Sequence, residues 1–154
     1  MGVLHAGLAP VVEIAGVRPN IVLVVVILVT VLRGFEAGIG WAFVAGLTAN
    51  LLGRQPLGSI PLELLLATVV VAGGERLFGR LVWVYPIAAV FVASMLADGV
   101  SLTILRLVDA SPGFGIPLQL IVPAAVLNAA LAGILLYPAR RIALRLGVDE
   151  TAAW

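Results

Sequence analysis

The chain contains no cysteine and no lysine, and its only histidine is His5, near the start. Without cysteine it cannot form a disulfide, a thiolate metal site or a cysteine nucleophile, and the position of His5 excludes imidazole catalysis in the core. Charged residues make up only 11% of the 154 residues, whereas apolar residues make up 62%. A mean hydropathy of +1.20 is far above that of a soluble domain, so the lipid bilayer is the expected solvent.

The sequence also lacks the patterns that cofactor and nucleic-acid chemistry require. It has no nucleotide-binding loop, no metal-ligand cluster and no nucleophile–base pair, and the Gly38-x-Gly40 pair is not followed by a phosphate-binding fingerprint. A net charge of +1 gives no electrostatic basis for binding nucleic acid. We therefore expect a protein that is not an enzyme and has no cofactor, metal or nucleic-acid partner.

Five apolar runs bounded by arginine, glycine and proline come close to the roughly 17 to 25 residues that cross a bilayer. Residues 1–17 are also apolar, but Pro10 and Glu13 predict an interfacial stub or a partial helix there. The expected fold is an all-α membrane protein, a bundle of about five to six transmembrane helices. The runs cover residues 19–33, 36–53, 59–78, 82–106 and 117–138. Together residues 1–154 form one integral membrane domain: the stub (1–17), the bundle (18–138) and a basic tail (139–154).

Arginine supplies all the positive side chains of the loops, and its distribution predicts the orientation. The side with more arginine is expected to face the cytoplasm, together with the C-terminus. Residues 139–147 (ARRIALRLG) have the pattern of a short basic amphipathic helix, either a membrane-surface anchor or a docking site for a partner. The richer side carries Arg33, Arg76, Arg80, Arg140, Arg141 and Arg145, and the other side carries Arg18, Arg54 and Arg106.

One face of the second run is made of small residues. Gly38, Ala42, Gly46 and Asn50 recur every four residues and share one side of a helix. Small residues let helix backbones approach closely, which is how helices gain packing energy in lipid. The Asn50 amide is expected to hydrogen-bond to a neighbouring helix, to belong to a ligand or ion site, or to form a switchable contact.

Asp98 is the residue least suited to lipid, because a buried carboxylate costs several kcal/mol unless it is paired, solvated or protonated. Ser94 and Ser101 share its helix face. Its expected partners are Asn50, Asn128, hydroxyls or water, and its expected role is to tie helices together. A role in proton or cation coupling would need a second buried acid. Glu63 is the only candidate, and its place after Pro61 is more simply explained as a helix start near the outer interface.

Residues 18–58 carry a resemblance to a known family. Arg18-Pro19-Asn20 opens the first span, residues 41–46 (WAFVAG) lie in the small-residue helix that carries Asn50, and the following loop ends in residues 56–58 (PLG). This order resembles the MreD family of rod-shape-determining inner-membrane proteins. The likeness is strongest over residues 18–78 and looser to about residue 145, where Asn128 matches an asparagine of the family. Members usually have a complete span before the Arg-Pro-Asn, so the resemblance implies a shortened N-terminus.

The resemblance implies a function in cell elongation. MreD-like proteins bind the bitopic scaffold protein MreC and belong to a complex with the actin-like MreB, the SEDS glycosyltransferase RodA and its class B penicillin-binding transpeptidase. They help organise lateral peptidoglycan synthesis. The residues expected to pack helices or meet the partner are Gly38, Ala42, Gly46, Asn50, Asp98 and Asn128.

A second hypothesis is a small-molecule binder. A compact helical membrane protein of this size also resembles the substrate-capture subunit of energy-coupling-factor vitamin transporters, a fold that MreD-like proteins are thought to share. The loops at residues 54–58 and 107–116 offer Arg54, Gln55, Asp109 and Ser111 but no aromatic cluster for a vitamin. The interaction protein is therefore the preferred interpretation.

The arginine distribution yields a topology prediction. A reporter fused after Trp154 should be cytoplasmic, and one inserted at Gly113 should be outside, because Arg140, Arg141 and Arg145 hold the C-terminus in the cytoplasm. A cysteine introduced at residue 113 should react with an impermeant reagent added to the outside of intact cells. Labelling only from the cytoplasmic side would overturn this topology.

Overall fold

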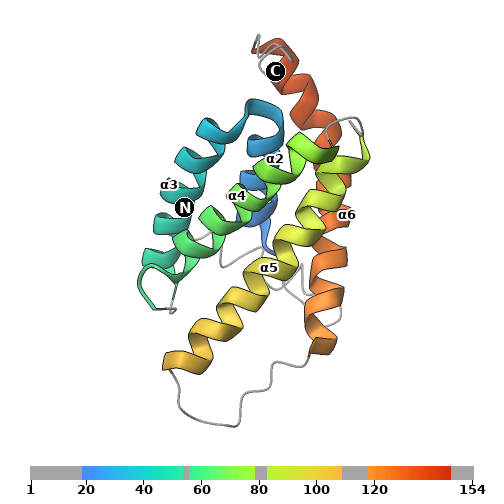
Figure 1. The fold of residues 1–154 in the computed structure, drawn as a ribbon. Helices are drawn as coiled ribbons and strands as arrows, with labels where there is room; N and C mark the ends of the chain where they lie inside the picture. Colours follow the sequence, from blue (N-terminus) through green and yellow to red (C-terminus); the bar gives the residue numbers. More distant parts are fainter. Residues whose placement is uncertain (1–18, 54–55, 79–82, 109–117, 147–154) are drawn as a thin grey trace.

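The computed structural model describes residues 19–53, 56–78, 83–108 and 118–146, and all the regular structure in these residues is helical. Figure 1 shows the five helices. The predicted stub and Arg18 lie outside the described residues, as do residues 147–154 of the basic tail. The same holds for Arg54, Gln55, Arg80, Asp109 and Ser111 of the loops. The helices are α2 (Ile21–Arg33), α3 (Phe35–Leu52), α4 (Ser59–Phe78), α5 (Val84–Val108) and α6 (Leu118–Arg145).

Each of the five apolar runs forms one helix, so the prediction of an all-helical protein is confirmed for the described residues. Three helices are long and apolar enough to cross a membrane: α3, α5 and the Ile121–Arg145 part of α6. The apolar helix α2 has only 13 residues. Helix α4 has 20 residues but carries Glu63, Glu75 and Arg76, so it is less apolar than its length suggests.

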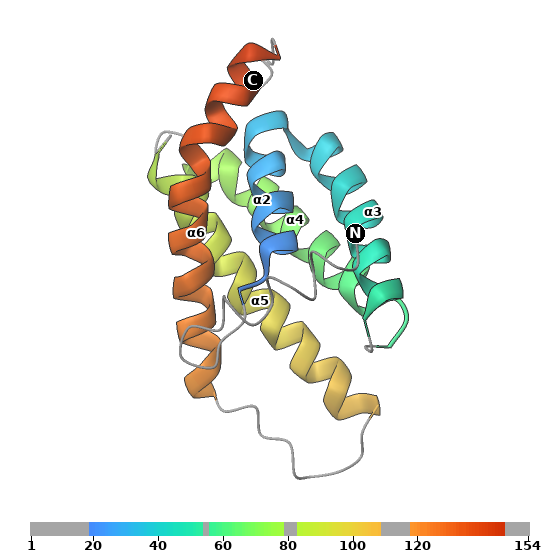
Figure 2. The same cartoon turned by 180° about the vertical axis from the view of Figure 1, so that it is seen from behind.

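Helix α2 lies at the centre of the bundle and packs against the other four helices. Figure 2 shows it between α3 and α6, in front of α4 and α5. Its side chains are apolar on every side, and Leu23, Val24, Val26 and Ile27 are fully buried. The Thr30 hydroxyl is buried as well, and donates to the Val26 carbonyl of its own helix at 2.8 Å. A helix that is apolar all round belongs in a core, and this one packs against all four other helices, while Ile21 (54%) and Val25 (40%) stay exposed on its remaining side.

Two glycines with positive φ shape the connections of α3. Gly34 (φ 91°) is the only residue between α2 and α3, and Gly58 (φ 93°) directly precedes α4. A side chain at either position would be strained, because only glycine adopts this backbone conformation without a steric cost. The two sharp turns place α2, α3 and α4 side by side, as Figure 1 shows.

The small face of α3 is the face that enters the bundle. Gly38, Ala42, Gly46 and Asn50 are the buried residues of this helix. A Cβ atom added to Gly38 would lie 2.9 Å from the Thr30 Cβ of α2, and one added to Gly46 would lie 2.7 Å from the Pro61 Cα of α4. Because glycine has no side chain, α3 can approach both α2 and α4 closely at these two positions.

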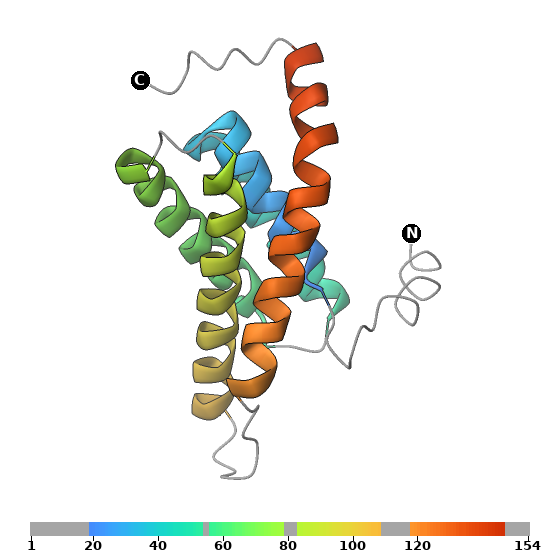
Figure 3. The same cartoon turned by 90° about the vertical axis from the view of Figure 1, so that its right-hand side faces the viewer.

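Helix α6 continues without a break through two prolines. Pro123 and Pro138 both lie inside it, and it ends only at Arg145. The first turns of the predicted basic tail are thus part of the same helix as the last span. Figure 3 shows this C-terminal part of α6 extending beyond the ends of the other helices.

The close contact at Gly46 yields a stability prediction. Gly46→Ala should lower the free energy of unfolding by about 1–3 kcal/mol, because the new methyl group would meet the backbone of Pro61, which cannot move aside as a side chain can. Gly46→Leu should cost more. Thermal unfolding of the purified protein in detergent measures both effects.

Gly40→Ala is the matched control. It is the same exchange in the same helix, but a Cβ atom there would meet nothing within 4 Å. Val44→Leu controls for the larger side chain, since Val44 is 61% exposed. If both controls destabilised the protein as much as the Gly46 variants, the assignment of the two faces of α3 would be wrong.

Candidate functional site

Polar side chains connect the helices at two places, one at the start of α2 and one between α4 and α5. Two of the buried hydroxyls, those of Thr30 and Thr68, lie elsewhere and donate to carbonyls of their own helices. Six other residues connect different helices: Asn20, Ser94 and Asn128 at the start of α2, and Glu63, Asp98 and Ser101 between α4 and α5. We call these six residues the polar cluster. It contains two of the six residues predicted to matter, Asp98 and Asn128.

Asn128 joins three helices through one amide. Its Oδ1 accepts from the Asn20 backbone N–H at 2.9 Å, and its Nδ2 donates to Ser94 Oγ at 3.0 Å. The Asn20 side chain in turn accepts from the Leu23 N–H at 3.1 Å and caps α2. The start of α2 is thereby fastened to both α5 and α6. The sequence analysis missed this cap, although asparagine directly before an apolar run is a pattern that could have predicted it, and nothing in the sequence indicated the contact with Asn128.

Asn50 stabilises the turn between α3 and α4. Its Oδ1 accepts from the Gly58 N–H, and its Nδ2 donates to the Pro56 carbonyl at 3.1 Å. The Ser59 hydroxyl donates to the same carbonyl at 2.9 Å. These bonds hold the backbone that enters α4, including the residue with positive φ. The amide thus acts on the adjoining turn as well as lying on the packing face of α3.

Glu63 differs most from its predicted environment. The sequence suggested an acid at a helix start near the outer interface, and Glu63 does lie near the start of α4; its side chain, however, is only 7% exposed and lies on the inner face of this helix with Leu64 and Ala67. The Ser101 hydroxyl of α5 interacts with its carboxyl group, and Asp98 lies close enough for its charge to act on Glu63. Glu63 Oε1 is buried and has no hydrogen-bond partner among the described residues.

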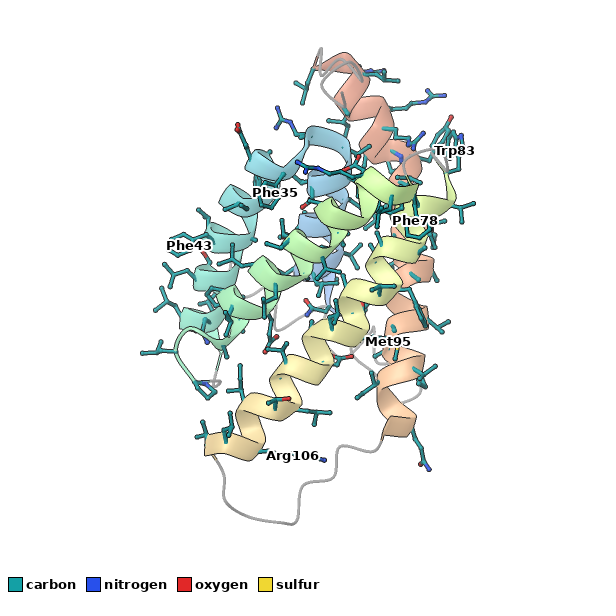
Figure 4. The ribbon with its side chains drawn as sticks, viewed as in Figure 1. Phe35, Phe43, Phe78, Trp83, Met95 and Arg106 are labelled. Atoms are coloured by element: carbon teal, nitrogen blue, oxygen red, sulfur yellow. The ribbon has the colours of Figure 1, made fainter. Side chains whose placement is uncertain are left out.

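The structure therefore brings together the two acids that the sequence left apart. Asp98 is half-buried on α5, and Ser101 on the same helix face reaches Glu63 of α4. Arg106, labelled in Figure 4, is exposed in the last turn of α5, two turns beyond Asp98. Two neighbouring carboxylates cost free energy inside a membrane when no positively charged side chain is paired with them. The pair could hold a proton, a cation or a cationic group supplied by another molecule.

The opposite end of the bundle combines arginine with aromatic rings. The Arg140 guanidinium lies 4.3 Å from the centre of the Trp83 ring, and that of Arg141 lies 4.9 Å from the centre of the Tyr137 ring. Figure 4 shows Trp83 beside the C-terminal part of α6. These cation–π contacts hold two of the three predicted basic residues against the bundle, and Arg145 is exposed in the last turn of α6.

Comparison with known proteins adds no relative. No protein-family model matches the chain, and neither a curated protein nor a solved structure matches it. Within the described residues, no group of three or more histidine, cysteine, aspartate or glutamate side chains is placed to hold a metal ion.

The contacts of Asn128 yield a prediction. Asn128→Ala should lower the free energy of unfolding by about 1–3 kcal/mol, because it leaves both the Asn20 N–H and the Ser94 hydroxyl without this partner. Ser94→Ala should cost less, about 0.6 kcal/mol, since it removes one interhelical bond and leaves the contact with Asn20.

Thr103→Ala is the control for this pair. Thr103 is exposed, and its hydroxyl donates to the Gly99 carbonyl of its own helix. Thermal unfolding in detergent should therefore rank Asn128→Ala as the least stable variant, then Ser94→Ala, then Thr103→Ala. Equal stability of the Asn128 and Thr103 variants would show that the Asn128 amide does not hold α2.

Proposed function

We propose that the protein is an MreD-like component of the bacterial cell-elongation machinery, not an enzyme, that binds an MreC-like bitopic scaffold protein in the inner membrane. Its role is to help organise or regulate lateral peptidoglycan synthesis and rod shape. The observation that carries the proposal is the sequence resemblance over residues 18–78. Several residues of that resemblance have specific structural roles here: Asn20 caps α2, Gly46 allows helix contact, and Asn50 holds the turn at Gly58.

The exposed face of α3 is the surface that we assign to the scaffold's transmembrane helix. The small face of this helix is occupied by α2 and α4, so it is not available to a partner. The opposite face presents Trp41, Val44, Thr48 and Leu51, all exposed and spaced three or four residues apart along one side. Figure 4 shows the neighbouring Phe43 on the outer side of α3. An apolar stripe of this kind suits a single membrane-spanning helix.

The remaining partners follow from membership of the same complex. A RodA-type SEDS glycosyltransferase, its class B penicillin-binding transpeptidase and MreB would be reached directly or through the scaffold. The end of the bundle with Arg140, Arg141 and Arg145 faces the cytoplasm in this proposal. Arginine beside Trp83 and Tyr137 fits the interface with anionic lipid headgroups, where both residue types are favoured.

One observation favours a second candidate function, the substrate-capture subunit of a vitamin or small-molecule transporter. The polar cluster contains two carboxyl groups, two amides and hydroxyls. These are more polar side chains for binding a ligand than the loops contain. A ligand retained by the purified protein and lost on substitution of the cluster would favour this function.

Co-purification tests the proposal. The protein should purify with a partner that has one transmembrane helix, and Asp98→Asn should retain that partner, because an amide keeps hydrogen bonding and removes the charge. Asp98→Leu should lower the yield of the complex and disturb rod shape, because an apolar side chain beside Glu63 loosens the contact between α4 and α5.

Two results would contradict the proposal. One is purification of the wild-type protein alone from cells that contain the scaffold. The other is an Asp98→Asn protein that keeps its fold and its partner but loses all activity, which would point to ligand or proton coupling as the function. Val92→Leu is the control for Asp98→Leu, since Val92 is exposed on the same helix.

A further inference from the structure

We infer that Glu63 and Asp98 form a carboxyl pair that holds one proton at the contact between α4 and α5. The site joins one acid from each helix, with the Ser101 hydroxyl beside them. At neutral pH the pair then carries a single negative charge rather than two. The inference does not depend on the identity of the partner protein.

The first support is the position of the Glu63 carboxyl. It lies on the face of α4 that enters the bundle, and only 7% of the residue is exposed. Its Oε1 atom has no hydrogen-bond partner in the described part of the chain. A buried carboxylate oxygen without a donor is among the most costly polar atoms a protein can hold. A proton on either carboxyl group removes this cost, because it provides the missing donor or neutralises the oxygen.

The second support is the charge of the surrounding elements. The arginines of the other helices lie at helix ends: Arg33 and Arg76 are in the last turns of α2 and α4, and Arg145 is in the last turn of α6. Helix α5 contributes Asp98 itself, and its Arg106 lies two turns away and is exposed. None of these described helices places a positively charged side chain beside the pair. Two like charges this close cannot both remain ionised in a medium of low dielectric constant.

The available oxygen atoms suit a proton better than a metal ion. Calcium takes six to eight oxygen ligands and magnesium takes six. The pair offers two carboxyl groups and one hydroxyl, and no larger acidic group lies within the described residues. A proton needs only one donor oxygen and one acceptor oxygen. The proton is therefore the ligand that suits the pair.

Infrared spectroscopy of the full-length protein in lipid tests the inference directly. A protonated carboxyl group has a C=O stretching band that a carboxylate lacks, and the band is seen even where reagents cannot reach. The wild-type protein at neutral pH should show this band, and it should fade as the pH is raised. The Glu63→Gln/Asp98→Asn double variant should lack it, whereas Glu36→Gln, which changes an exposed acid of α3, should keep it.

A second measurement serves if the double variant does not fold. Unfolded carboxyl groups are ionised at neutral pH, so the folded state binds one more proton than the unfolded state, and raising the pH should destabilise the fold. The folding equilibrium constant of the wild type should fall by up to tenfold for each pH unit, and Asp98→Asn should change this slope.

Three results would overturn the inference. The first is the absence of the band from the wild type at neutral pH. The second is a band that persists unchanged in a folded double variant, since the proton would then lie elsewhere. The third is a missing band combined with stabilisation by sodium but not by choline, which would identify a metal cation as the ligand.

Discussion

The whole bundle depends on the burial of α2. This 13-residue helix is too short to cross a bilayer by itself, and it is stable at the centre because four helices cover its apolar surface. The first N–H groups of a helix have no acceptor within the helix, so other groups must accept their hydrogen bonds. The Asn20 cap and the Asn128 amide provide two of these acceptors. The position of α2 therefore follows from the polar contacts at its start as much as from its apolar sides.

The sequence predicted the elements much better than it predicted their contacts. The five helices were visible because apolar runs and glycine or proline boundaries are local features, and the small face of α3 was visible because it repeats every four residues. The contact of Asn128 with Asn20 spans 108 residues and depends on the depth and rotation of two helices. Glu63 was expected near the interface for the same reason: its local signal is that of a helix start, and only the packing of α4 against α5 shows that it is buried.

The two ends of the bundle differ in chemistry. At the start of α2, the Asn128 amide and the Ser94 hydroxyl connect α2, α5 and α6, and two carboxyl groups lie between α4 and α5. At the other end, arginines lie over aromatic rings, an arrangement that keeps positive charge at a surface while covering apolar atoms. This asymmetry separates residues that affect helix arrangement from residues at the arginine-rich end of the bundle.

The continuity of α6 connects these two regions mechanically. The same helix carries Asn128, which holds the start of α2, and Arg145, which lies 17 residues further on, about 25 Å along the axis. A continuous helix transmits rotation and translation along its length with little loss. A molecule that pulls on the basic end of α6 therefore also moves the residue that holds the central helix in place. A force applied at this end of the molecule can in this way reach the middle of the bundle.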